Sequence, residues 1–503
     1  MMPQIRLEKV DKRYFRQIKR YRDEMLKSES SFDGCSNLDY YDNISRWIDH
    51  CHKMESIENR QSGLVNSDQL LLVTETEEVI GMVNIRRKLN PLLLMVGGHI
   101  GYSILPTYRN QGYGKKLLSL ALDYCQSIGI REISVSCFSD NIASRKIILA
   151  NKGEYDSTME IGNRKVERYW IAMEEKIKVI MDCDTGSDDA IAIMMAILSE
   201  KIELLGICTV AGNKALNYTT ENTLAVVEAL KSDVKVFAGC GSSMVTRLLP
   251  TRRGSYGGFT GVKEDGDKEP EITYHHDHLP LPTPVRKAEK KNAVLWLVET
   301  LLEAKEKITM VITGPMTNMA MALRIEPKIA ENIKEIIFMG GGFKVFNATR
   351  CSEFNIWADP EAAQIVLTSG IKCTMVPLDA THKANFDYAD CQRLRAMNNI
   401  VTDAVALMIE QRIEAYDAYQ PQEILGTAPI HDALVVGYLL EPKVLEEISL
   451  MRVDVDFSGG MADGQTICDT RAYPDDERNC YVALGANNEL FHQLVFSLLE
   501  KVN

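Results

Sequence analysis

The segment Lys178–Asp189 reads KVIMDCDTGSDD, and it decides the fold of the larger part of the chain. A short β-forming run is followed at once by aspartates and then by the apolar helical run Ala190–Leu198. Similar strand-like runs alternate with helical stretches further along the chain, which predicts a largely parallel sheet covered by helices. These runs are Lys178–Met181, Leu204–Val210, Ile308–Thr313, Glu335–Met339 and Lys372–Val376.

Four aspartates, at positions 182, 184, 188 and 189, follow the first of these strands. The carboxyl ends of parallel strands line the ligand crevice of such a sheet, so we expect a binding site here. Like charges this close repel one another unless a cation compensates them. Oxygen ligands without cysteine or histidine favour Ca²⁺ or Mg²⁺ over zinc. One or two of the aspartates can instead cap the helix, but four exceed that need.

Length and composition limit the remaining interpretations. A chain of 503 residues is expected to form roughly two to four domains. The net charge of −13 disfavours nucleic acid as a partner, because phosphate binding needs a basic surface. The N-terminal stretch lacks the apolar core of a signal peptide, and the longest apolar run is too short to span a membrane. We therefore expect a cytoplasmic protein without a membrane partner, whose 12 cysteines form neither disulfides nor a zinc site.

A change in composition at Arg168–Lys178 indicates a boundary, and we predict domains at residues 1–175 and 176–503. Upstream, the order of strand-like and helical runs predicts a mixed α+β domain. The strand His99–Ile104 leads into Pro106–Lys116, PTYRNQGYGKK, and then into an amphipathic helix. Glycines and unpaired amides at a helix start favour a pyrophosphate. The same glycines can also simply form a tight turn.

A second motif, Asp140-Asn-Ile-Ala-Ser144, follows the next strand, and the two motifs together resemble the GNAT N-acetyltransferases over roughly residues 1–174. Many members use a tyrosine acid shortly after the asparagine, and the matching stretch Ile147–Gly153 has none. Glu154, Tyr155 and Tyr102 are alternatives for that role, and a regulatory acyl-CoA sensor is an alternative function. The resemblance implies an acetyl-CoA site at Arg109, Gln111, Gly112, Tyr113, Gly114, Lys115, Asn141 and Ser144.

Further motifs follow the aspartate run in a fixed order. They are Thr209-Val-Ala-Gly-Asn213, Thr313-Gly-Pro-Met-Thr-Asn318, Met339-Gly-Gly-Gly342, Asn347, Glu353-Phe-Asn355 and Ala428-Pro-Ile-His431-Asp432. The ordered set resembles the inosine–uridine nucleoside hydrolase family over about residues 177–503. The implied architecture is α/β: an N-terminal α+β GNAT fold followed by a Rossmann-like, largely parallel hydrolase domain. The implied reaction is hydrolysis of the bond between ribose and a nucleobase.

The resemblance also implies the roles of individual residues. Ca²⁺ would be bound by Asp184, Asp189, Asp432 and the carbonyl oxygen of Thr313. Asp184 would also accept a proton from the attacking water, and His431 would protonate the departing base. A nucleoside is the expected substrate, and homo-oligomers through the hydrolase domain are left open. The residues expected to hold the ribose, with Met339 packing nearby, are Asp188, Asn213, Asn347, Glu353 and Asn355.

Several alternatives stay open at the level of sequence. Glu353 and Asn355 could cap the helix near Pro360, although Asp359 already suits that position. Tyr256 stands where many members have a His–Gly pair, and Tyr416 and Tyr419 could stack on the base. We expect the run His275–His278 to be solvated rather than metal-bound. The rival function is a nucleoside- or ribose-sensing protein without catalysis, and a further rival leaves the acyltransferase as the only active half.

Overall fold

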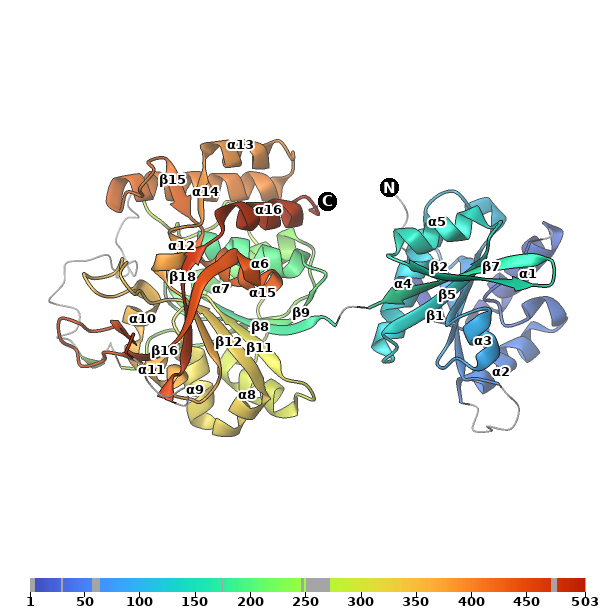
Figure 1. Cartoon of the computed structure of the whole chain (residues 1–503), viewed down its shortest axis with the longest axis horizontal. Coiled ribbons are helices and arrows are strands. Elements are labelled where there is room, and N and C mark those ends of the chain that lie inside the picture. The colour runs from blue at the N-terminus through green and yellow to red at the C-terminus, as the bar shows by residue number, and fades with distance from the viewer. Residues whose placement is uncertain are drawn as a thin grey trace. The chain divides into compact units, whose positions relative to one another are not determined.

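The computed structural model describes residues 5–28, 30–56, 64–173, 175–245, 248–249, 272–471 and 477–502. The chain forms two compact units, Met1–Glu175 and Lys176–Asn503 (Figure 1). Within the described residues, no helix has both the length and the apolar character needed to cross a membrane.

The smaller unit is α+β and contains two sheets. A four-stranded antiparallel sheet has the order β1-β2-β3-β4, and a three-stranded antiparallel sheet has the order β5-β7-β6. The strands are β1 Ile5–Lys9, β2 Ser67–Thr74, β3 Val79–Arg86, β4 Ile100–Ile104, β5 Glu132–Phe138, β6 Glu154–Ile161 and β7 Arg164–Ala172. The helices are α1 Phe15–Lys27, α2 Ile44–Glu55, α3 Pro91–Met95, α4 Tyr113–Ser127 and α5 Ile142–Ala150. The mixed strand and helix order expected from the sequence is confirmed.

The larger unit is built on a nine-stranded sheet of order β10-β9-β8-β11-β12-β13-β18-β16-β17. In this order, the first seven strands, from β10 at the edge to β18, run parallel to one another. β16 pairs antiparallel with both β18 and β17. The chain adds strands on one side of β8 and then on the other, so the strand order reverses between β8 and β11. The strands are β8 Ile177–Cys183, β9 Ile202–Thr209, β10 Val236–Ala238, β11 Ile308–Ile312, β12 Ile333–Met339, β13 Cys373–Val376, β16 Leu445–Val455, β17 Thr466–Asp469 and β18 Cys480–Ala486.

Helices cover both faces of this sheet, as Figure 1 shows, and a hydrophobic cluster fills each interface. One cluster includes Ile191 and Val435, and the other includes Leu297 and Met319. The first face carries α6 Ser187–Leu198, α7 Leu216–Ala229, α14 Ile400–Tyr419, α15 His431–Leu440 and α16 Asn488–Leu499. The second carries α8 Ala293–Glu303, α9 Thr317–Ile325 and α11 Pro360–Leu367. The predicted α/β architecture is therefore confirmed.

Shorter elements complete the larger unit near the carboxyl ends of the strands. They are α10 Phe354–Ala358, α12 Leu378–Thr381, α13 Tyr388–Arg395, β14 Asn385–Asp387 and β15 Thr427–Pro429. The segment Thr251–Pro284, which is rich in glycine, proline and charged residues, lies partly outside the described residues. Its described part, residues 272–284, contains neither helix nor strand.

Candidate active site

Two helix starts bring acidic side chains together at the point where the strand order reverses. β8 ends at Cys183 and α6 begins at Ser187, so Asp188 and Asp189 lie in the first turn of α6. Asp432 lies in the first turn of α15. The first-turn amides of a helix favour negative charge, which explains why acidic residues suit these positions.

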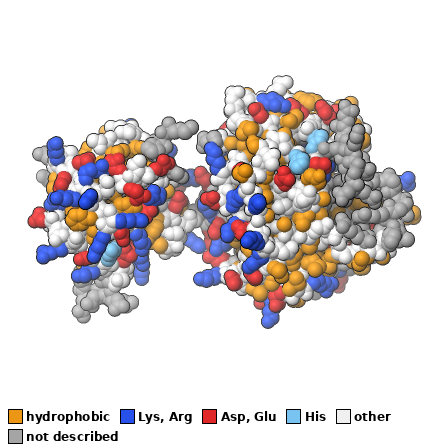
Figure 2. Space-filling model, turned by 180° about the vertical axis from the view of Figure 1, so that it is seen from behind, with side chains coloured by type: hydrophobic (Ala, Val, Ile, Leu, Met, Phe, Trp, Pro, Cys, Tyr) orange, Lys and Arg blue, Asp and Glu red, His pale blue; other side chains and the backbone are white. Residues whose placement is uncertain are grey.

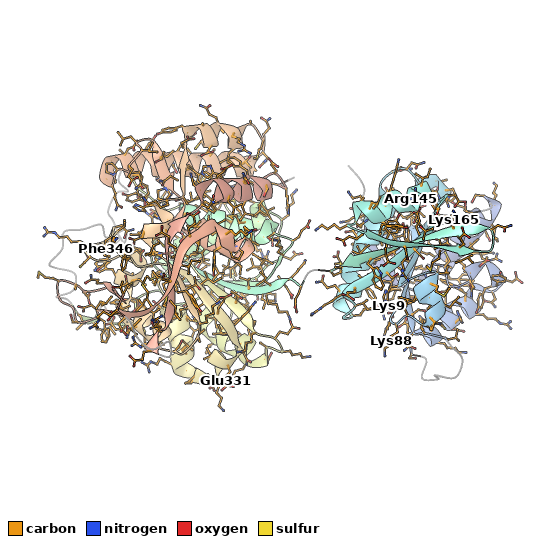
Figure 3. The ribbon with its side chains drawn as sticks, in the orientation of Figure 1. Lys9, Lys88, Arg145, Lys165, Glu331 and Phe346 are labelled. Atoms are coloured by element: carbon orange, nitrogen blue, oxygen red, sulfur yellow. The ribbon has the colours of Figure 1, made fainter. Side chains whose placement is uncertain are left out.

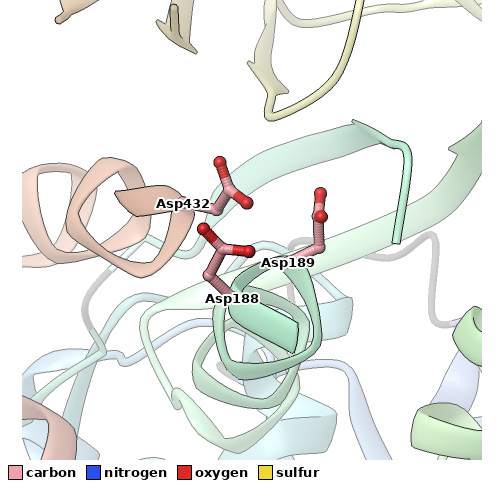
Figure 4. Close-up of side chains that lie close together, drawn as sticks. All are labelled: Asp188, Asp189 and Asp432. Carbon is pink, nitrogen blue, oxygen red and sulfur yellow. The ribbon is translucent and has the colours of Figure 1, made fainter. Parts of the chain in front are cut away.

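Asp188, Asp189 and Asp432 form a buried acidic group, in which one oxygen from each side chain lies within 4.8 Å of the others. Figure 4 shows the three side chains close together at the starts of the two helices. Burial, followed by the charge of Asp188, raises the pKa of Asp189 to about 7, and burial also raises the pKa of Asp432 well above its usual range. A bound divalent cation would reverse both effects, because it stabilises ionised oxygen ligands.

Asp184 lies next to the acidic group but is not one of its three members. Its Oδ2 accepts a hydrogen bond from the Asn213 amide at 2.6 Å, whereas its buried Oδ1 has no hydrogen-bond partner. A Cβ atom on Gly212 would lie 2.0 Å from Asp184 Oδ2, so the approach of this loop requires glycine. An orphaned buried carboxylate oxygen beside other carboxylates fits a cation ligand.

Asp182 is separated from the other aspartates of the sequence run. It lies within β8, is fully buried, and accepts a hydrogen bond from Asn318 Nδ2 at 2.8 Å. Burial raises the pKa of Asp182 to about 7. The run of four aspartates therefore does not act as one cluster.

Thr313 connects the acidic group to the polar residues around it. Its hydroxyl donates to Asp189 Oδ1 at 2.6 Å, and its carbonyl oxygen accepts from Asn355 Nδ2 at 2.8 Å. Asn355 Nδ2 also lies 3.2 Å from the carbonyl oxygen of Met339. Thr313, Met339 and Asn355 therefore meet at one place.

Glu353 caps α10, and its carboxylate accepts hydrogen bonds from the amides of Gly341, Asn355 and Ile356. Burial outweighs these donors and raises the pKa of Glu353 to about 7. The prediction that Asp359 caps the next helix is confirmed, because its side chain accepts from the Ala362 amide. Glu353 therefore caps a different helix from the one considered at the sequence level.

A cavity of about 350 Å³ opens at this edge of the sheet, a size suited to a small molecule. Figure 2 shows histidine side chains beside acidic ones on the larger unit, and Phe346, labelled in Figure 3, lines the cavity. Aromatic rings of Tyr274, Tyr416 and Tyr419 also line it. Asp184 and Asp189 are buried and do not line it. The sequence-predicted residues that do are Asp188, Asn213, Thr313, Met339, Asn347, Glu353, Asn355, His431 and Asp432.

His431 is buried and hydrogen-bonded through both ring nitrogens. Nε2 lies 2.5 Å from the Tyr416 hydroxyl, and Nδ1 lies 2.7 Å from the Thr381 hydroxyl. Burial, followed by the charges of Arg412 and the neighbouring histidines, lowers the pKa of His431 well below its usual range. The ring is therefore neutral near pH 7, so one nitrogen donates and the other accepts.

Two charged or titratable residues of this cavity, Arg412 and His275, were not assigned to it from the sequence. Arg412 is 1% exposed, and its Nη1 lies 3.1 Å from Asp188 Oδ1. The expectation that His275 is solvated is wrong, because its Nδ1 accepts from the Ser187 amide at 3.2 Å and its side chain is 18% exposed. Burial lowers the pKa of His275 to about 3. Tyr256 lies outside the described residues.

The glycine motif of the smaller unit forms the start of α4. Gly112 caps this helix with a φ of +86°, a conformation that favours glycine, and no side chain caps the helix. Arg109 Nε donates to the Ile104 carbonyl, and Gln111 Nε2 donates to the Thr107 carbonyl. The turn therefore presents uncapped amides, as an anion site requires. Of the other predicted residues of this turn, Tyr113 is buried, Lys115 is exposed, and Gly114 lies against Ile147.

Asn141 and Ser144 stand at the start of α5, where Asn141 caps the helix by accepting from the Ser144 amide at 3.0 Å. The Ser144 hydroxyl lies 3.0 Å from the hydroxyl of Tyr102 on β4. Burial raises the pKa of Tyr102, whereas Tyr155 and Glu154 are exposed. Among the three alternatives for an acid, Tyr102 is thus the one that contacts a predicted acetyl-CoA residue.

Comparison with known proteins assigns both units. The family model for the inosine-uridine preferring nucleoside hydrolases matches residues 179–493. The chain belongs to this nucleoside hydrolase family. The GNAT acetyltransferase family model matches residues 36–148, so the chain carries an acetyltransferase domain before the hydrolase domain, in the order that the sequence implied.

Relatives of the nucleoside hydrolase domain are known from sequence and from structure. The pyrimidine-specific ribonucleoside hydrolase RihB of Escherichia coli strain SE11 is 35% identical over 325 residues, which are 64% of this chain and 96% of that relative. The solved structure of a purine-preferring ribonucleoside hydrolase from Gardnerella vaginalis is 29% identical, with a TM-score of 0.56, covering 65% of this chain and 98% of that one. A plant nucleoside hydrolase at 24% identity and a TM-score of 0.55, covering 65% of this chain and 99% of that one, shows the fold alone.

Proposed function

We propose that the hydrolase domain uses Ca²⁺ to hydrolyse the N-glycosidic bond of ribonucleosides, which gives ribose and a free base. The observation that supports this proposal is the buried acidic group of Asp188, Asp189 and Asp432, next to the orphaned Oδ1 of Asp184. Several buried carboxylates, with no histidine or cysteine among the proposed ligands, suit a hard divalent cation. Lining by polar residues and aromatic rings suits a sugar joined to a planar base.

In this proposal Asp184, Asp189, Asp432 and the Thr313 carbonyl hold the cation. A bound divalent cation lowers the pKa of a water molecule beside it. Asp184 accepts the proton of the attacking water, because one of its oxygens is fixed by Asn213 and the other is free of hydrogen bonds. Binding of the cation would replace the hydrogen bond that the Thr313 carbonyl oxygen accepts from Asn355 Nδ2.

We propose that the ribose is held by polar residues that line the cavity. Vicinal hydroxyls both donate and accept, so they suit a mixture of carboxylates and amides. Hydrogen bonds that strengthen as the sugar takes on oxocarbenium character would lower the barrier. The residues are Asp188, Asn213, Asn347, Glu353 and Asn355, with Met339 packing beneath the sugar.

His431 is proposed to deliver a proton to the departing base together with Tyr416. The imidazole is neutral in the free protein, and the Tyr416 hydroxyl oxygen lies 2.5 Å from its Nε2. Negative charge that develops on the base would draw a proton toward it from this pair.

The hydrolysis proposal is tested by product analysis of the purified protein with a panel of purine and pyrimidine ribonucleosides. The panel needs both classes because the relatives are named pyrimidine-specific and purine-preferring. We expect ribose and free base in equal amounts, loss of turnover with a calcium chelator, and recovery when Ca²⁺ is added back. Absence of product with every nucleoside at saturating Ca²⁺ would refute hydrolysis, and full activity after chelation would refute the role of the metal.

For the acetyltransferase domain, we propose transfer of the acetyl group of acetyl-CoA to an amine, with the pyrophosphate at the start of α4. The uncapped amides behind Gly112 support this placement. We also propose a cytoplasmic location, since all twelve cysteines are free thiols, which suits a reducing compartment. Calorimetry with acetyl-CoA tests the first proposal, and absence of binding would refute it.

A further inference from the structure

Arg412 is held in a fixed position beside the acidic group by contacts to two other elements, β15 and α6. Its Nε donates to the carbonyl of Pro429 on β15 at 3.0 Å, and its Nη1 donates to the Ser187 hydroxyl on α6 at 3.2 Å. The same Nη1 lies 3.1 Å from Asp188 Oδ1, and both side chains are almost fully buried, at 1% and 4% exposed. This guanidinium is therefore a built-in part of the site rather than a surface arginine that happens to lie near.

The ion pair makes Asp188 different from the other members of the acidic group. Within the part of the chain that the structure describes, neither Asp189 nor Asp432 forms an ion pair with a lysine or arginine. Asp188 also lines the cavity, whereas Asp189 does not. The negative charge of Asp188 is thus already compensated by a buried guanidinium.

Calcium and a guanidinium compete for the same carboxylate. A divalent cation at Asp188 would bring two positive centres close together in a poorly solvated place, where their repulsion is strong. The uncompensated carboxylates offer better ligands, among them the orphaned Oδ1 of Asp184. Without Arg412, Asp188 would have no counter-charge and would lie within 4.8 Å of the other two carboxylates, in reach of the same ion.

We infer that Arg412 is a positioning residue that divides the acidic group: it keeps Asp188 out of the calcium shell and presents it to the ribose as a hydrogen-bond acceptor. The inference rests on the proposed function, because it assumes that Ca²⁺ and a nucleoside share this site. According to this inference, Arg412 determines which carboxylates bind the metal. The positions of the carboxylates alone do not determine this.

The test is a double-mutant cycle on the full-length protein, with Ca²⁺ binding measured by titration calorimetry. In the wild type, Asp188→Asn should change the calcium dissociation constant by less than about threefold, because Asp188 is not a ligand. In the Arg412→Met background, the same change should weaken calcium binding by about tenfold or more, because Asp188 has become a ligand there. Arg412→Lys is the matched control, since it keeps a cation beside Asp188.

A second readout follows the substrate. At saturating Ca²⁺, Asp188→Asn in the wild type should raise KM for the nucleoside about tenfold or more while the calcium affinity stays near that of the wild type. This arm needs no change at Arg412, so it tests whether Asp188 serves the ribose and not the metal even if Arg412→Met does not fold. The role of Arg412 itself is tested by repeating Asp188→Asn in the Arg412→Met and Arg412→Lys backgrounds, because a purely structural role would give the same calcium effect in both.

Two results would overturn the inference. One is a loss of calcium affinity of about tenfold on Asp188→Asn in the wild type, which would make Asp188 a ligand. The other is an equal effect of Asp188→Asn in the wild-type and Arg412→Met backgrounds. If the wild type bound no calcium, the proposed function would fail as well. Calcium binding with either of the two contrary results would overturn the inference alone.

Discussion

Replacing Glu353 by glutamine should reduce the pH dependence of the stability of the hydrolase domain. Burial raises the pKa of Glu353 from 4.5 to about 7 in the folded protein, although three backbone amides donate to its carboxylate. The folded pKa is raised above the unfolded value. The stabilising contribution of the protonated group is therefore complete below about pH 4.5 and is lost as the pH rises through about 7.

The magnitude follows from the two pKa values. Between about pH 5.5 and about pH 8, ionisation of a group whose pKa moves from 4.5 to about 7 lowers the free energy of unfolding by about 2 kcal/mol. Glu353→Gln removes this pH-dependent loss. The glutamine side-chain nitrogen cannot accept from a backbone amide, so the variant is also less stable at every pH, but this effect does not depend on pH.

The free energy of unfolding would be measured by denaturant titration. At each denaturant concentration, hydrogen–deuterium exchange of peptides from the hydrolase domain would report how much of that domain is unfolded. Local readout is needed because the chain has two units that can unfold separately. The control is Glu331→Gln, which changes an exposed carboxylate of the same domain, labelled in Figure 3, and should leave the pH dependence as in the wild type. If Glu353→Gln also leaves it unchanged, the backbone donors outweigh burial and the reasoning is refuted.

Further expectations concern catalysis and the domains. Asp184→Asn should abolish turnover while weakening nucleoside binding far less; equal losses in kcat and in affinity would contradict its role as base. His431→Ala should slow hydrolysis of nucleosides by on the order of 10²–10⁴ but spare p-nitrophenyl riboside, whose leaving group needs no proton, and equal losses for both substrates would leave His431 a structural role. Gly112→Val should weaken acetyl-CoA binding in calorimetry, because valine disfavours a φ of +86°; unchanged affinity would move the site elsewhere. Separate expression of residues 1–175 and 176–503 should give two folded pieces with hydrolysis retained by the second, and activity only on recombination would show an obligate interface.

The sequence predicted those parts of the site that depend on local order along the chain. A β-forming run followed by acidic residues and an apolar helix places Asp188 and Asp189 at a strand end and a helix start, whatever the rest of the fold does. The capping position of Asp359 before Pro360 was predictable for the same reason. The ordered motifs could then be joined into one site because parallel strands share an edge.

The parts that sequence reasoning missed depend on contacts between distant segments. Arg412 lies on a helix, where an arginine ordinarily indicates a solvated face, and its burial follows from Ser187 and Asp188 far along the chain. His275 belongs to a loop without a periodic pattern, so nothing local shows that it folds back onto α6. Asp182 was grouped with the other aspartates because all four follow one another closely at a strand end, but Asp182 lies within β8 and its carboxylate accepts a hydrogen bond from Asn318.

The hydrogen bond from Thr313 to Asp189 joins residues 124 positions apart, and the one from Arg412 to Ser187 joins residues 225 positions apart. Contacts of such long range form late in folding, because the loops between them must close first. Asp432 therefore reaches Asp188 and Asp189 only after the strands of the central sheet have assembled. Under the proposed function, calcium would therefore bind only the assembled domain. It would stabilise that domain by binding the native state and not the unfolded chain.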